Sequence, residues 1–84
     1  METTLPVHLR WQCRRGMLEL DVLLGHFLTE AYLSLSVQDQ DTFVRLLACN
    51  DQSLFNWFTG IEQADDEILA AMVAKILTHA KNRH

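Results

Sequence analysis

Apolar residues recur at steps of three and four positions along most of this 84-residue chain, and no stretch alternates convincingly between apolar and polar residues. Such spacing lines one face of an α-helix, whereas a half-buried strand needs a period of two. The length suits one small domain and leaves no room for a second independent core. With 49% hydrophobic and 21% charged residues, the composition is that of an ordinary globular protein. The sequence therefore predicts a single all-α domain over residues 1–84.

Glycines and small polar residues divide the periodic pattern into about five helices. Gly16 and Gly60 stand where a left-handed residue can end a helix, and Ser36, Asn50 and Asp51 stand where a side chain can cap a helix start. The predicted helices cover residues 6–14, 17–34, 37–48, 52–59 and a last stretch that starts at the acidic run 65–67. Only short turns separate them, so the expected architecture is a compact helical bundle.

Each predicted helix has an apolar stripe that is expected to face the core. The helix over 17–34 is apolar on two faces and is therefore expected to be central. Pro6 suits the first turn of the first helix, with Thr4 as its cap, and Phe55 is expected on the face opposite the core. The residues expected in the core are Met17, Leu20, Leu24, Phe27, Leu28, Ala31, Leu35, Phe43, Leu46, Leu47, Leu54, Trp57, Phe58, Ile68, Leu69, Met72, Val73, Ile76 and Leu77.

The formal charge of −4 argues against a general nucleic-acid binder, which needs a basic surface. Charge is unevenly distributed, at +2 over residues 1–16, −9 over 17–74 and +3 over 75–84. No apolar run reaches the roughly 18 residues of a membrane helix, and the N-terminus has no apolar signal core. We therefore expect a cytoplasmic protein without membrane insertion. Cys13 and Cys49, which form no CxxC pair, are expected to stay reduced.

The residues that most often carry chemistry do not form a recognisable active site or metal site. His26 and Glu30 are four positions apart, but two ligands do not close a metal site. His79 and His84 fall in the expected frayed end of the last helix, and His8 has no ligand partner at a metal-binding spacing. With only three glycines and no phosphate-binding loop, the chain is predicted to be neither an enzyme nor a stable cofactor carrier.

Two cysteines have different expected environments. Cys13 lies near two arginines, which could lower the pKa of its thiol and make it a candidate nucleophile. Cys49 ends an apolar run and is expected to be a small core residue.

The turn between the first two predicted helices gathers side chains that a simple helix corner does not require. Glu19 falls in a first helical turn, where the dipole favours its charge by roughly 0.3–1 kcal/mol and where Arg15 could pair with it. Those terms do not explain a tryptophan and two arginines beside a glycine, whereas a flat corner that a partner backbone approaches closely would. The candidate partner-binding residues are Trp11, Arg14, Arg15, Gly16, Glu19 and Asp21.

This segment resembles the signature of the SdhE family, the FAD assembly factors of the succinate dehydrogenase and fumarate reductase flavoprotein. The family's core pattern, Arg-Gly-x-x-Glu, is matched by Arg15, Gly16 and Glu19 within the run RRGMLELD. The resemblance extends over residues 8–77 and includes Trp11, Cys13, Asp21, the run FVRLL at 43–47 and the run LFNW at 54–57.

The resemblance implies a five-helix cytoplasmic protein that binds the flavoprotein subunit and promotes covalent attachment of FAD to a histidine of that subunit. It implies that FAD is handled on the client flavoprotein, with none bound stably by this chain and no nucleic acid or metal involved. A monomer is expected. Arg15, Gly16 and Glu19 would make the contact, with Trp11, Arg14 and Asp21 as neighbours.

Three alternatives remain open from the sequence. Members of this family have also been labelled antitoxin CptB, which would make the chain an interaction module that neutralises a toxin partner. A helical nucleic-acid binder would use Arg10, Arg14 and Arg15, against the acidic balance of the remaining chain. An enzyme would use Cys13 as its nucleophile.

Overall fold

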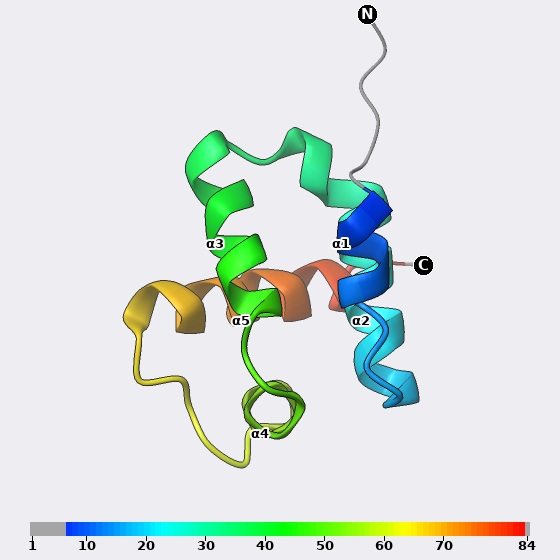
Figure 1. The fold of residues 1–84 in the computed structure, drawn as a ribbon. Helices are drawn as coiled ribbons and strands as arrows, with labels where there is room; N and C mark the ends of the chain where they lie inside the picture. The colour runs from blue at the N-terminus through cyan, green and yellow to red at the C-terminus, as the bar shows by residue number, and fades with distance from the viewer. Residues whose placement is uncertain (1–6, 84) are drawn as a thin grey trace, which may run out of the picture.

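The computed structural model describes residues 7–83, which form five α-helices and no strand (Figure 1). The all-α prediction is confirmed. The elements are α1 (Val7–Gln12), α2 (Leu18–Ala31), the 3-10 helix η1 (Tyr32–Ser34), α3 (Val37–Leu47), α4 (Asp51–Thr59) and α5 (Glu67–Lys81). The stretch predicted as one helix over 17–34 is therefore α2 followed by η1, and α1 ends at Gln12, two residues earlier than expected. The predicted roles of Thr4, Pro6 and His84 lie outside the described residues.

Helix starts and ends follow the local chemistry of the sequence. The Ser36 Oγ accepts a hydrogen bond from the Asp39 backbone N at 3.1 Å, and the Asn50 Oδ1 accepts one from the Ser53 backbone N at 2.8 Å. Both satisfy backbone donors that the first turn of a helix leaves free. Gly60 ends α4 with a φ of 84°, the left-handed conformation that glycine adopts at least cost.

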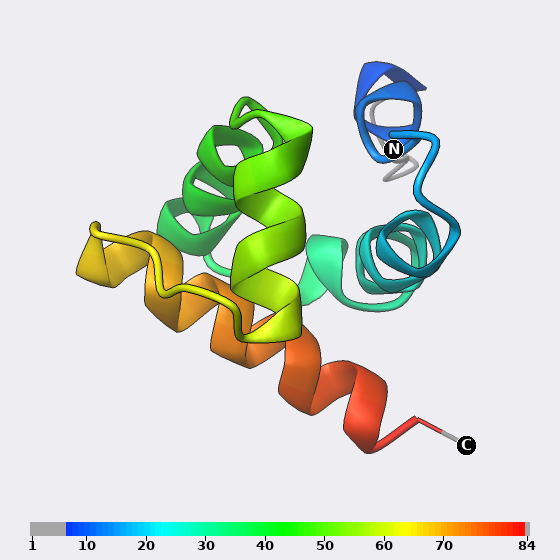
Figure 2. The same cartoon turned by 90° about the horizontal axis from the view of Figure 1, so that it is seen from below.

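The helices form two groups that α5 joins. Figures 1 and 2 show α1 beside α2 on one side and α3 with α4 on the other. Helix α5 packs against α2, α3 and α4, so it runs across both groups. The α1–α2 pair is thereby held at one edge of the molecule, with its connecting turn at the surface.

The core is built around three aromatic rings. Phe27 and Phe43 have ring centroids 5.5 Å apart, and Phe43 and Tyr32 have centroids 5.8 Å apart. Most of the expected core residues are buried or pack against buried residues, namely Met17, Leu20, Leu24, Phe27, Leu28, Ala31, Leu35, Phe43, Leu46, Leu47, Leu54, Trp57, Phe58, Leu69, Met72, Val73 and Ile76. Phe55 is exposed, as predicted.

Two of the expected core positions are wrong. Ile68 is 57% exposed and lines a groove between α3 and α5 together with Asp39 and Thr42. Leu77 is exposed at the rim of a cleft between α4 and α5. In both cases helical spacing identifies the correct stripe, but the neighbouring helices do not cover its whole length.

Candidate partner-binding site

The turn between α1 and α2 is a tight, defined structure, which we call the corner and define as residues 11–21. After α1, the Arg14 backbone N donates to the Trp11 backbone O at 3.0 Å. Gly16 follows with a φ of 80°, as its place in the sequence predicted. A Cβ built on Gly16 would meet nothing within 4 Å, so the backbone conformation, and not crowding, is what favours glycine here.

Asp21 fixes the corner from the α2 side. Its Oδ1 accepts a hydrogen bond from the Arg15 backbone N at 2.7 Å, and its Oδ2 accepts one from the Gly16 backbone N at 3.3 Å. A carboxylate that accepts backbone N–H bonds is a strong, charge-assisted acceptor. Asp21 therefore holds the shape of the corner, a role that its position in the sequence did not reveal.

Arg15 fixes the corner from the opposite side. Its Nε donates to the Gln12 backbone O at 2.8 Å, and its Nη1 donates to the Cys49 backbone O and to the Asp51 Oδ1, each at 3.0 Å. Its Nη2 donates to the Leu47 backbone O. The carbonyls of Leu47 and Cys49 lie at the C-terminal end of α3, where a cation is favoured. Arg15 thus joins the corner to the α3–α4 connection.

The expected pairing of Arg15 with Glu19 is wrong. The Arg15 side chain is only 13% exposed, and its ion pair is with Asp51. The physical reason is that several fixed acceptors at one place outcompete a single flexible carboxylate on the surface. Glu19 is exposed, and within residues 7–83 it takes part in no ion pair or side-chain hydrogen bond.

The outer surface of the corner combines an aromatic, an apolar and two charged side chains. Trp11 is 69% exposed and Leu18 is 80% exposed, and Arg14 and Glu19 are also exposed. Large exposed apolar side chains together with Trp and Arg are typical of protein–protein contacts. Of the six predicted site residues, Trp11, Arg14, Gly16 and Glu19 face solvent, whereas Arg15 and Asp21 support the corner from within.

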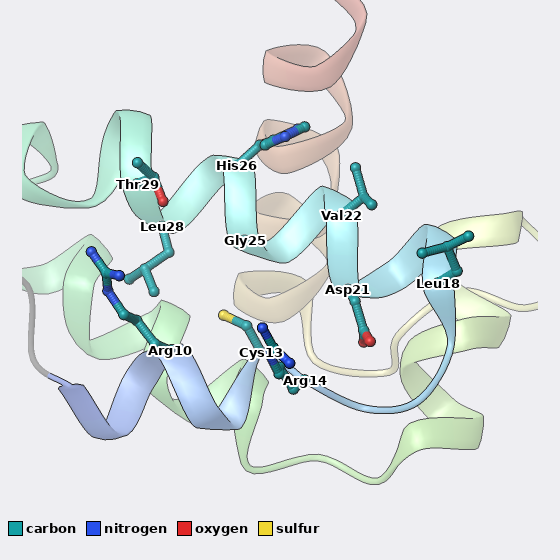
Figure 3. Close-up of a pocket in the computed structure, with 10 residues that line it drawn as sticks. All are labelled: Arg10, Cys13, Arg14, Leu18, Asp21, Val22, Gly25, His26, Leu28 and Thr29. Carbon is teal, nitrogen blue, oxygen red and sulfur yellow. The ribbon is translucent and has the colours of Figure 1, made fainter.

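A groove of about 520 Å³ lies next to the corner, between α1 and α2. Figure 3 shows Arg10, Cys13 and Arg14 on the α1 side of the groove. Leu18, Asp21, Val22, Gly25, His26, Leu28 and Thr29 line the α2 side.

Cys13 does not have the environment of a nucleophile. Its side chain is buried, and burial raises the pKa of the Cys13 thiol to about 11, although the charge of Arg15 acts in the opposite direction. The expectation that nearby arginines lower this pKa is wrong because loss of water outweighs their attraction. The thiolate is the reactive form of cysteine, so this thiol is poorly suited to attack. Cys49 is half-buried against the core, close to the role predicted for it.

The histidine predictions need one correction. His79 lies within α5, not in a frayed end, and its ring meets Phe27 edge-on with centroids 5.4 Å apart. Its Nε2 is 3.1 Å from the Glu30 Oε1, and Glu30 also accepts from the Arg83 Nε at 2.7 and 2.9 Å. Hydrogen bonding to Arg83 lowers the pKa of Glu30. Nothing in the described part of the chain gathers three or more His, Cys, Asp or Glu side chains as a metal site would.

No helix among residues 7–83 is both long enough and apolar enough to span a bilayer. The fold and the corner define a small all-α domain whose distinctive feature is a surface turn that is fixed from within by Arg15 and Asp21.

Comparison with known proteins identifies the family of this chain. It belongs to the family described as the flavinator of succinate dehydrogenase, whose model matches residues 7–80. The FAD assembly factor SdhE of Colwellia psychrerythraea is 56% identical over 73 residues, which cover 87% of this chain and 80% of the relative. The protein of the same name from Idiomarina loihiensis is 49% identical over 73 residues, covering 87% and 81% of the two chains.

A third relative extends the match. The FAD assembly factor SdhE of Shewanella oneidensis is 49% identical over 76 residues, covering 90% of this chain and 93% of the relative. The resemblance to the SdhE family is confirmed, and the antitoxin alternative finds no support in these names.

Proposed function

We propose that this chain is an assembly factor that binds the flavoprotein subunit of succinate dehydrogenase or fumarate reductase and promotes covalent attachment of FAD to a histidine of that subunit. Membership of the flavinator family and the names of the relatives support this function. The observation that supports the corner as the contact is Glu19, an exposed carboxylate that has no ion pair within residues 7–83.

The corner contributes shape and oriented polar groups. Arg15 and Asp21 fix the backbone on either side of Gly16, so the surface is organised before the partner arrives. Gly16 has no side chain, which lets a partner backbone approach closely. Glu19 and Arg14 then present charges of opposite sign from a backbone whose shape is fixed, which favours one orientation of the complex over others.

Assistance of this kind requires only that the chain binds one conformation of the flavoprotein more tightly than the others. The ratio of that conformation to the others then rises by at most the ratio of the two affinities. Each tenfold preference corresponds to about 1.4 kcal/mol, which a few oriented contacts can supply. The chain therefore holds the flavoprotein in an arrangement that is competent for flavin attachment.

FAD supplies the bond-making chemistry, and the flavoprotein subunit holds it. Residues 7–83 do not fit a dinucleotide site, because Gly16 lies in the turn between α1 and α2, Gly60 ends α4 and Gly25 lies inside α2, so none of these glycines builds a phosphate-binding loop. The corner offers Glu19 and Arg14 but no activated nucleophile. We propose that the chain is a chaperone of flavin attachment and not a catalyst, and that it acts as a monomer in the cytoplasm.

The test measures covalent flavin on the denatured flavoprotein subunit by its fluorescence in a gel. The subunit comes from cells that lack this chain and that are complemented with the wild type or with a variant. Wild type should restore the signal, and Glu19→Ala should not. Loss of Glu19 should reduce the stability of the purified chain by at most about 1 kcal/mol, the size of a helix-dipole contribution.

Glu67→Ala is the matched control, because Glu67 is also an exposed acid in a first helical turn, at the start of α5. It should lower stability by a similar amount and leave flavin attachment intact. If covalent flavin is unchanged in cells without the chain, the proposed function is wrong. If Glu19→Ala is unfolded, Glu19 is a structural residue and the corner loses its main support.

A further inference from the structure

The groove between α1 and α2 is continuous with the corner, since it shares Arg14, Leu18 and Asp21 with it. Its volume of about 520 Å³ is far larger than the roughly 30 Å³ that one water molecule occupies in the liquid, so it has room for side chains of a partner. Figure 3 shows its two walls, with the arginines on the α1 side and a row of α2 residues opposite.

The charge of the groove is opposite to that of the molecule. Arg10 and Arg14 line one wall, whereas the whole chain carries a formal charge of −4. Asp21 is the only acid among the lining residues, and its two carboxylate oxygens already accept backbone N–H bonds of the corner. The groove therefore suits an anionic occupant.

The floor of the groove is apolar and contains an unexplained glycine. Val22 and Leu28 flank Gly25 on α2. Gly25 is not among the glycines with positive φ, and a Cβ built on it would meet nothing within 4 Å. Glycine inside a helix is less stable than alanine, so neither backbone conformation nor packing within the described chain accounts for it. Its effect is to leave open the space that a side chain at this position would occupy.

We propose that this groove receives a segment of the flavoprotein subunit in which acidic side chains flank an apolar residue. The acidic groups would meet Arg10 and Arg14, and the apolar side chain would occupy the space that Gly25 leaves. This inference rests on the proposed function, and it extends the contact from the corner along the length of α2.

The test is the dissociation constant for the purified succinate dehydrogenase flavoprotein subunit, measured by fluorescence anisotropy of the labelled chain. Gly25→Leu fills the groove and should weaken binding at least tenfold, while its Tm stays equal to or above that of wild type. Ala74→Leu is the matched control, because it adds the same side chain in the separate cleft between α4 and α5, and it should change the dissociation constant less than twofold.

Arg10→Gln provides a second variant at an exposed position, so the proposal remains testable if Gly25→Leu does not fold. It should weaken binding at low salt and reduce the dependence of affinity on salt concentration, because an ion pair is removed. Unchanged affinity in folded Gly25→Leu and in Arg10→Gln would overturn the proposal.

Other outcomes separate this inference from the function on which it rests. If Glu19→Ala abolishes binding and both groove variants bind normally, the groove is not a contact and the proposed function stands. If the wild-type chain does not bind the flavoprotein, both the groove proposal and the proposed function are wrong. If Gly25→Leu instead dissociates a dimer of this chain, or removes binding of free FAD, the groove has a different occupant and the proposal is overturned.

Discussion

Replacement of Arg15 by alanine is the perturbation that most directly tests how the corner is held. The side chain makes four hydrogen bonds, to the backbone carbonyls of Gln12, Leu47 and Cys49 and to the Asp51 carboxylate. Hydrogen bonds to a charged group contribute about 1.5–3 kcal/mol each but are not additive, and breaking a buried ionic network costs about 3–5 kcal/mol. The Asp51 side chain is 45% exposed, so water can solvate it once Arg15 is gone. We therefore expect Arg15→Ala to lower the free energy of unfolding by about 3 kcal/mol, the lower end of that range.

That loss is large for a chain of this size. A domain of 84 residues has a free energy of unfolding of roughly 4–13 kcal/mol. Since 1 kcal/mol corresponds to about 4–8 °C in Tm for a small domain, Arg15→Ala should melt about 12–24 °C below wild type. Thermal unfolding followed by circular dichroism at 222 nm measures this shift.

Arg14→Ala is the internal control, because the neighbouring arginine is exposed and makes no side-chain hydrogen bond or ion pair in the described chain. The free energy of unfolding of Arg14→Ala should stay within about 0.5 kcal/mol of the wild-type value. Arg15→Lys keeps the positive charge but loses the planar guanidinium group with its several donors. It should therefore still lower the free energy of unfolding by about 2 kcal/mol relative to wild type. If Arg15→Ala melts within 3 °C of Arg14→Ala, the reasoning about the corner is refuted.

Three further predictions follow from the structure. Gly16→Ala and Gly60→Ala should each lose about 1 kcal/mol, because alanine is strained at positive φ, but only Gly16→Ala should also reduce flavin attachment. Cys13, whose pKa is raised to about 11, should resist Ellman's reagent at pH 8 in the folded chain and react once the chain unfolds in urea. Glu30 has a lowered pKa, so its contribution to stability is present above its ordinary value of 4.5 and is lost as pH falls through the folded value. Urea unfolding of wild type and Glu30→Gln should therefore differ at pH 7 and converge in acid, and parallel curves would contradict the pairing with Arg83.

The features that the sequence predicted well are local ones. Ser36, Asn50 and Gly60 act within a few residues, so their chemistry alone locates the starts of α3 and α4 and the end of α4. Gly16 marks the turn between α1 and α2, but α1 already ends at Gln12. The apolar stripe of α2 also follows from spacing alone, because one face of this helix is covered along its whole length.

The features that the sequence could not predict depend on partners far along the chain. Arg15 is hydrogen-bonded to residues 32 to 36 positions away, and no local pattern distinguishes those acceptors from the nearby Glu19. His79 contacts Phe27 and Glu30 only because α5 crosses α2. Ile68 has the spacing of a core residue, but it lines the groove between α3 and α5 and is 57% exposed.

The bonds of Arg15 also set an order for folding. A helix of six residues such as α1 is not stable alone in water, and the corner is anchored through groups at the end of α3 and the start of α4. The chain must therefore close a loop of more than 30 residues before the corner acquires its final shape. A chain that has not completed folding would therefore lack the surface that we propose contacts the flavoprotein.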